Sequence, residues 1–251
     1  MIIAQITDTH ILPKDTGDPA GAARAASLRQ CIADINRRGV DAVVHTGDSV
    51  HHGLPEEYAH LHEILSGLKP PLFMTAGNRD RPSLLRDIFA GRHAVLGEGE
   101  FLHYAVDGFP IRLVVLDSTS PGERKGVFCS ARLAWLDETL AREPLKPTIL
   151  FIHHPPFDIV PHYEDGYRRP QDASDLAALV SRHPQVIRLI CGHVHCVHST
   201  DWADTVATSM PSIAVDLRKG VDPAFGTTPL YALHEVSQNG DVAIRMCAVG
   251  E

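Results

Sequence analysis

Cysteine is scarce in this chain, and the spacing of the cysteines matches no known disulfide or zinc-binding motif. The 251 residues include five cysteines, an odd number, and no two of them form a C-x-x-C pair. The sequence therefore gives no sign of a disulfide framework or of a zinc ribbon. We expect reduced, buried thiols, because free cysteine behaves as a small apolar side chain.

Long apolar runs are also missing. All of them are far shorter than the roughly 20 residues that a membrane helix needs, which argues against a membrane protein. The N-terminus has neither a basic segment nor a cleavage site, so we expect a cytoplasmic protein. No Ser/Gly linker or break in composition divides the sequence, which predicts one domain over residues 1–251.

Positive charge is in short supply. Lysine and arginine number 23 against 31 aspartates and glutamates, and the net charge is −8. Long nucleic acids bind to surfaces rich in Lys and Arg, so this balance disfavours a nuclease or a nucleic-acid-binding protein. A small phosphorylated substrate is compatible with the acidity, because bound metal ions would supply positive charge locally.

What the chain does have is a series of polar side chains, each just past an apolar run that is typical of a buried strand. The runs cover residues 2–6, 42–44, 72–74, 149–152 and 186–191, and the side chains are Asp8, His10, Asp48, Asn78, His153, His193 and His195. Because the carboxyl ends of parallel strands gather at one edge of a sheet, these seven donors predict a single site. Their number is sufficient for two metal ions.

The spacing and chemistry of the donors favour catalytic metals. Residues at i and i+2 of an extended chain face the same side, so Asp8 with His10, and His193 with His195, can reach one ion. A mixed nitrogen and oxygen set without thiolate suits divalent Mn, Fe, Zn or Co, whereas structural zinc sites usually contain cysteine. Any single Gly-Asp or Asp-x-His pair is ordinary turn chemistry, and only the whole series indicates a metal site.

Strand and helix signals alternate in the first part of the chain, and strands dominate later. Helices are expected at residues 20–38, 55–68, 132–142 and 172–182, with a short one after Pro82. A β-hairpin is expected at 101–106 with 111–116, and further strands at 230–236 and 242–248. This order favours two facing sheets flanked by helices over one doubly wound sheet.

Taken together, these residues resemble the calcineurin-like metallophosphoesterases, over residues 8 to 195. Residues 4–10, 115–119, 133–136 and 153–156 further resemble the bacterial class III cyclic-nucleotide phosphodiesterases and the related glycerophosphodiesterases. The resemblance implies an α/β fold, a four-layer αββα sandwich of two mixed sheets flanked by helices, with a dinuclear metal centre. Related enzymes form dimers or higher assemblies, so a homodimer or higher homo-oligomer is expected.

The resemblance also implies a role for each residue. One ion would be held by Asp8, His10 and His195, and the other by Asn78, His153 and His193, with Asp48 bridging the two. Asp48 and Arg79 would act in catalysis, and the substrate would contact Asn78, Arg79 and His195. His154 would support the site without binding a metal.

One position departs from the family pattern. The family reads Gly-Asn-His-Asp where this chain has Gly77-Asn78-Arg79-Asp80. In the family the histidine contacts the phosphate and is a candidate for protonating the leaving oxygen, whereas arginine holds its proton and can only stabilise charge on phosphoryl oxygens. The acid would then be a metal-bound water or another histidine, with His52, His162 and His198 as candidates. In a competing interpretation, Arg79 merely pairs with Asp48 or Asp80.

The function expected is hydrolysis of a small phosphodiester by in-line attack of a metal-bridging hydroxide, with a 3′,5′-cyclic nucleotide such as cyclic AMP favoured, or a glycerophosphodiester. Two divalent ions offset by two aspartates and one hydroxide leave a charge of about +1, which matches a monoanionic diester. Arg79 would also welcome a dianion, so a phosphomonoesterase is an alternative. A non-catalytic scaffold, as in the retromer subunit on this fold, is disfavoured because every ligand position keeps a donor.

The surroundings of the site are less legible. Residues 155–170 and 209–212 are expected to form the pocket wall, because they lie close in sequence to the ligands. Tyr163 or Phe157 would either stack on a nucleobase or simply pack.

Overall fold

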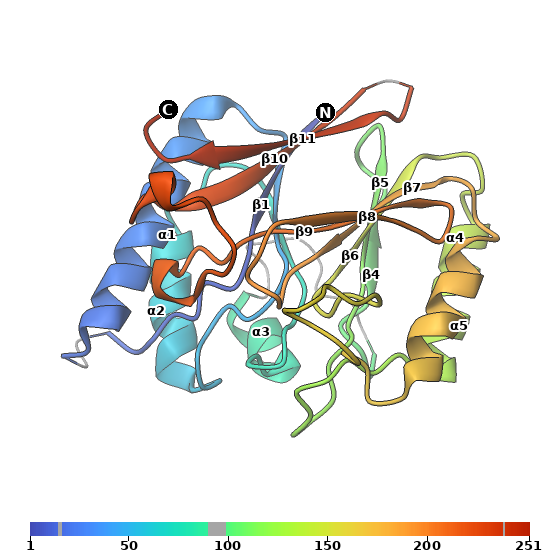
Figure 1. Ribbon diagram of the computed structural model, residues 1–251, viewed down its shortest axis with the longest axis horizontal. Helices are drawn as coiled ribbons and strands as arrows, with labels where there is room; N and C mark the ends of the chain where they lie inside the picture. The colour runs from blue at the N-terminus through green and yellow to red at the C-terminus, as the bar shows by residue number, and fades with distance from the viewer. Residues whose placement is uncertain (15–16, 90–98, 238) are drawn as a thin grey trace.

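The computed structural model describes residues 1–14, 17–89, 99–237 and 239–251. Its strands form two mixed sheets (Figure 1). The first sheet has the order β11-β10-β1-β2-β3, with β1 (Ile2–Ile6), β2 (Ala42–His45), β3 (Leu72–Met74), β10 (Leu230–Val236) and β11 (Val242–Ala248). The second has the order β4-β5-β6-β7-β9-β8, with β4 (Tyr104–Val106), β5 (Arg112–Val115), β6 (Thr148–Ile152), β7 (Val186–Cys191), β8 (His198–Trp202) and β9 (Thr205–Ser209).

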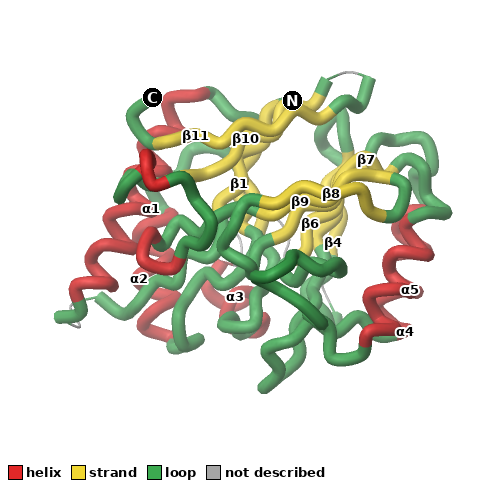
Figure 2. The backbone as a smooth tube through the Cα atoms, in the orientation of Figure 1, coloured by secondary structure: helices red, strands yellow, loops and turns green. Residues whose placement is uncertain are grey.

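The helices lie in two groups on opposite sides of the sheets (Figures 1 and 2). The first group is α1 (Pro19–Arg38), α2 (Pro55–Leu65) and α3 (Pro82–Phe89), and the second is α4 (Ser130–Ala141) and α5 (Pro170–Val180). Two short 3₁₀ turns, η1 (Val215–Leu217) and η2 (Pro223–Phe225), precede β10. The helices follow the predicted amphipathic segments, but α1, α4 and α5 begin one or two residues earlier than expected and α2 ends three residues earlier. In α1 and α5 the early start is a proline, whose fixed φ suits the first helical turn.

Three apolar clusters correspond to the three interfaces between the four layers. Leu28, Leu61 and Phe89 join the first helical group to its sheet, and Leu136 and Leu176 join the second group to the other sheet. Between the sheets, a third cluster combines β1 to β3 with β5 to β7. The expected αββα sandwich is thus confirmed, because each sheet buries both faces.

The described residues bear on two further expectations. Within them, no helix is long and apolar enough to cross a membrane. All five cysteines are free, and four of them are buried, as predicted, while Cys129 is partly exposed.

Candidate metal centre

The parallel strands deliver the predicted donors to one place from both sheets. In the first sheet, β1, β2 and β3 run parallel, and in the second β6 and β7 do. The pairing continues beyond the strands, because Asp8 N–H donates to Gly47 O and His10 N–H donates to Asp48 O, both at 3.0 Å. His153 ties the two sheets together through its Nδ1, which lies 2.8 Å from Thr46 O.

The first group of donors consists of Asp8, His10 and His195. Nε2 of His195 lies 3.2 Å from Asp8 Oδ1 and 3.3 Å from Nε2 of His10. The second group consists of Asn78, His153 and His193. Nε2 of His153 lies 3.3 Å from Asn78 Oδ1 and 3.2 Å from His193 Nδ1. Each group is compact enough for its atoms to surround one small cation.

Asp48 lies between the two groups and turns one oxygen towards each. Its Oδ2 is 3.7 Å from His10 Nε2, and its Oδ1 is 3.5 Å from His153 Nε2. Its Oδ1 also accepts a 2.7 Å hydrogen bond from the backbone N–H of Arg79, which fixes the carboxylate plane. The structure therefore brings together all seven donors that the sequence singled out, with Asp48 at the centre.

Most of these residues have a strained backbone. Five of the seven lie in the left-handed region, with φ of 51° at Asp8, 44° at His10, 50° at Asp48, 72° at His193 and 59° at His195. Such conformations are uncommon outside glycine and cost on the order of 1–3 kcal/mol each. They persist only where neighbouring contacts hold them, and they cluster at functional sites. Here the left-handed turn aims each side chain off the end of its strand into the shared site.

The two buried carboxylates have opposite acidities. Burial opposes ionisation of Asp8, but His195, His153 and His10 together hold the pKa of that carboxyl well below its usual range. Burial and then the nearby Asp8 carboxylate raise the pKa of Asp48 to about 8. Two buried carboxylates this close repel each other without a positive partner. The protein alone thus leaves an electrostatic conflict that bound cations would relieve.

The hydrogen bonds around the donors fit a metal. Nδ1 of His195 lies 2.9 Å from Leu217 O and Nδ1 of His153 lies 2.8 Å from Thr46 O, so each Nδ1 carries the proton and each Nε2 offers its lone pair to the site. This is the usual arrangement of metal-binding histidines. Asp8 Oδ2 accepts from Thr7 and from His193 N–H, while its buried Oδ1 has no hydrogen-bond partner among the described residues. An unpaired oxygen that faces the lone pair of His195 Nε2 at 3.2 Å is a place for a cation.

The comparisons with known proteins agree with this geometry. Residues 1–197 match the family described as "calcineurin-like phosphoesterase". The chain belongs to the calcineurin-like phosphoesterase family. It is 34% identical over 235 residues to the "probable glycerophosphodiester phosphodiesterase GpdQ" of Arcobacter nitrofigilis, covering 91% of this chain and 86% of that one.

Two further similarities extend the comparison. The "3′,5′-cyclic adenosine monophosphate phosphodiesterase CpdA" of Escherichia coli K12 is 26% identical over 224 residues, covering 86% of this chain and 77% of its own. The crystal structure of a dimetal phosphatase from Danio rerio superposes with a TM-score of 0.74 at 15% identity, covering 99% of this chain and 98% of that chain. At that identity the superposition shows the shared fold alone. The family resemblance expected from the sequence is confirmed, and the chain is a metal-dependent phosphoesterase.

Arg79 is partly buried at the edge of this phosphoesterase site. Only its backbone N–H bonds to Asp48. In the described part of the chain, its guanidinium group forms no ion pair with Asp48 or Asp80, although such a pair was one interpretation of the sequence. Asp80 instead accepts from the backbone N–H groups of Ser49 and Gly77, which joins the loops after β2 and β3.

The histidines proposed as the acid have different surroundings. His52 pairs with Glu57 at 2.9 Å, His198 stacks on Phe157 with ring centroids 6.1 Å apart, and His162 is exposed. The sequence reasoning missed His51, whose Nδ1 lies 3.4 Å from Nδ1 of His10. Its only sequence signal was a position three residues beyond Asp48, next to His52.

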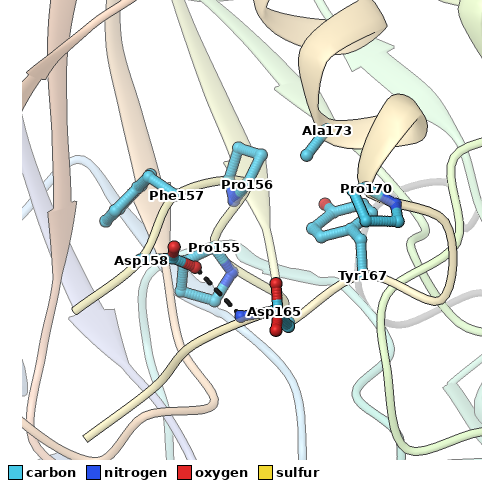
Figure 3. Close-up of a pocket in the computed structure, with 9 residues that line it drawn as sticks. Pro155, Pro156, Phe157, Asp158, Asp165, Tyr167, Pro170 and Ala173 are labelled. Atoms are coloured by element: carbon cyan, nitrogen blue, oxygen red, sulfur yellow. Dashed lines mark hydrogen bonds between the residues drawn. The ribbon is translucent and has the colours of Figure 1, made fainter. Parts of the chain in front are cut away.

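The loop between β6 and α5 forms a pocket of about 180 Å³ against that helix (Figure 3). Tyr167 donates to His154 O at 3.1 Å, and Asp165 N–H donates to Asp158 Oδ1 at 3.1 Å. Tyr163 packs its ring edge-on to His193, with centroids 5.3 Å apart, and donates its hydroxyl to Pro155 O. Both ring nitrogens of His154 have protein partners, Ser118 Oγ and Arg124 O, so this histidine supports the loop.

Proposed function

We propose that residues 1–251 act as a single dinuclear phosphodiesterase domain that hydrolyses small phosphodiesters. The observation that carries this proposal is the position of Asp48, whose two oxygens face two separate donor groups. One carboxylate shared in this way suits a pair of cations rather than a single ion. The mixed imidazole and oxygen donors favour divalent Mn, Fe, Zn or Co.

In this proposal Asp8, His10 and His195 hold one ion, and Asn78, His153 and His193 hold the other. When bound, the ions supply Lewis acidity and lower the pKa of a water molecule towards neutrality. Asp48 would be a ligand shared by both ions. Asn78 and His195 border the space where the phosphoryl group would lie, and the guanidinium of Arg79 would donate charge-assisted hydrogen bonds to its oxygens.

Two substrate classes are supported. Cyclic nucleotides, favoured from the sequence, match the name of the Escherichia coli relative, and glycerophosphodiesters match the name of the relative with higher identity. Both are monoanionic diesters, which balance the charge of about +1 left by two divalent ions, two aspartates and one hydroxide. The proposal is therefore a diesterase for small diesters, which opens the ring of a cyclic nucleotide or releases the alcohol of a glycerophosphodiester.

A substrate panel under Mn²⁺ tests the proposal. Cyclic AMP, cyclic GMP, glycerophosphocholine and bis-para-nitrophenyl phosphate are compared with para-nitrophenyl phosphate, each by kcat/KM. We expect faster turnover of the diesters, with either cyclic AMP or glycerophosphocholine leading. Faster turnover of the monoester would establish a phosphomonoesterase instead, and neither turnover nor bound metal would favour the scaffold.

A further inference from the structure

Residues 212–219, together with Arg24, form a brace behind one of the two donor groups. This segment includes η1 and lies beyond residues 1–197, which match the family. Its own shape is closed by Arg218, whose Nε donates to Ser212 O at 3.1 Å. Together with Arg24 it makes hydrogen bonds to Asp8, His10 and His195, and also to Thr7 and His51.

The brace bonds to the backbone of all three residues in that group. Ser212 donates its hydroxyl to Asp8 O at 2.6 Å, and Lys219 N–H donates to His195 O at 3.0 Å. Arg24 Nη1 donates to His10 O at 3.2 Å. These three carbonyl groups belong to residues with φ of 51°, 44° and 59°, so each strained backbone is held by one donor of the brace.

Arg24 links α1 to residues 212–219 as well as to His10. Its guanidinium pairs with Asp216 of η1 through two bonds, of 3.1 Å from Nε and 2.6 Å from Nη2. The arginine side chain is buried, whereas the Asp216 side chain is 44% exposed, so the forked geometry rather than shielding from water defines this pair. The next residue of η1, Leu217, accepts the Nδ1 proton of His195 at 2.9 Å and so orients that ring.

The other donor group is held differently. His153 is oriented by Thr46 O, and the backbone N–H of His193 donates to Asp8 Oδ2. Within the described residues, the brace makes no hydrogen bond to Asn78, His153 or His193. The support of the two groups is therefore unequal.

We propose that the brace is a positioning element that sets the cation affinity of the Asp8, His10 and His195 position, and leaves that of the other position unchanged. This inference rests on the proposed dinuclear site. Its physical basis is that partners which orient metal ligands typically contribute 10- to 100-fold to affinity. Arg24 and Asp216 act through His10 and His195, so they are positioning residues.

The test is a titration of the metal-free full chain with Mn²⁺. Calorimetry records the heat of binding, and electron paramagnetic resonance records the concentration of free Mn²⁺. We expect two binding events in the natural chain. Arg24→Gln and Asp216→Asn should each weaken one event by about 10- to 100-fold and leave the other within twofold. Arg24→Lys keeps the charge but loses the forked geometry, so it should restore the affinity in part.

Double variants, in which a ligand of one metal position is also removed, show which position the change at Arg24 affects. With Asn78→Ala, Arg24→Gln should weaken the binding that remains, whereas with His10→Ala it should have no further effect. The matched control is Arg38→Gln, which removes another ion pair of α1, to Asp34 at 2.7 Å, away from the brace. It should lower thermal stability without changing either Mn²⁺ affinity.

The outcomes separate this inference from the function on which it rests. Equal weakening of both events, no weakening, or the same loss in Arg38→Gln would overturn the brace. Failure of the natural chain to bind two ions would instead overturn the dinuclear proposal. Circular dichroism of each variant confirms that it is folded before titration.

Discussion

Nε2 of His10 and Nε2 of His195 lie 3.3 Å apart, although 185 residues separate them in the sequence. One follows β1 of the first sheet and the other follows β7 of the second. Because Nδ1 of His195 donates to Leu217 O, its Nε2 presents a lone pair to the facing ring. Two imidazoles in this arrangement are stabilised by a cation between them. The contact between the two sheets is therefore also the place where a metal would be gripped.

Asp48→Asn should trade activity for stability. Loss of the shared carboxylate should lower diester turnover by more than about 100-fold, because both cations lose a ligand. Without metal at pH 7 the variant should unfold a few degrees above the natural chain, because the natural Asp48 carboxyl, whose pKa is raised to about 8, must take up a proton on folding and asparagine does not. Diester kinetics under Mn²⁺ measure the first effect and thermal unfolding of the metal-free proteins measures the second, and a metal-free variant that melts lower would contradict the argument. Asp41→Asn, an exposed aspartate that accepts from Ile2 N–H, should show no gain.

Arg79→Ala should reduce kcat/KM for a diester by about 10- to 100-fold, the size of one lost charge-assisted hydrogen bond. Mn²⁺ affinity should not change, because only the backbone of Arg79 contacts Asp48. Arg79→His should raise kcat above that of Arg79→Ala, since imidazole can supply a proton at neutral pH. Steady-state kinetics of the three proteins test the role, and unchanged turnover in Arg79→Ala would refute it.

Gly77→Ala should disable the metal site, because the added methyl group would clash with two of its ligands. An added Cβ would overlap the backbone nitrogen and Oδ1 of Asp48, and would lie 2.8 Å from Cε1 of His153. We expect a loss of Mn²⁺ binding and a destabilisation of about 1–3 kcal/mol, typical of overpacking. The control is Gly108→Ala, where a Cβ meets no atom within 4 Å. Equal behaviour of the two variants in chemical denaturation and Mn²⁺ titration would rule out the steric explanation.

Acid should destabilise the fold through His234, which lies between the sheets and is hydrogen-bonded to Gln5 Oε1 at 3.0 Å. Burial and then Arg188 lower its pKa from 6.5 to about 3, so the folded chain keeps it neutral where the unfolded chain protonates it. Its stabilising contribution is complete above pH 6.5 and is lost as the pH falls towards 3.

The measurement is urea unfolding at pH 7.5 and pH 5. The natural chain should lose up to about 2 kcal/mol more than His234→Gln between these values, because 1.36 kcal/mol accompanies each pH unit below 6.5. The exposed His162→Gln serves as control and should behave as the natural chain does. A constant difference between the natural chain and His234→Gln would show that the group titrates normally.

Much of the fold was legible because local pattern and tertiary structure agree. The apolar runs at residues 72–74 and 186–191 became β3 and β7 without change. The candidate donors could be named because each followed such a run, and topology then brought them together. Helix boundaries were less certain. The residues at 66 and 67, Ser and Gly, end α2 earlier than its apolar spacing suggested.

The supports of the site could not be read in the same way. Thr46 and Leu217 act through backbone carbonyl groups, which every residue has, so their side chains give no signal. Arg24 is an ordinary helical arginine in the sequence, and its partner Asp216 is 192 positions away. The substrate, the metals, the oligomeric state and the cytoplasmic location stay predictions.

The left-handed backbone at Asp8 and Asp48 limits which substitutions these two positions tolerate. Asparagine adopts that conformation as readily as aspartate does, so either position can lose its acid group and keep its turn. Hydrolysis would end while the outline of the molecule survived. One small exchange thus separates an active site from an inert one on the same fold.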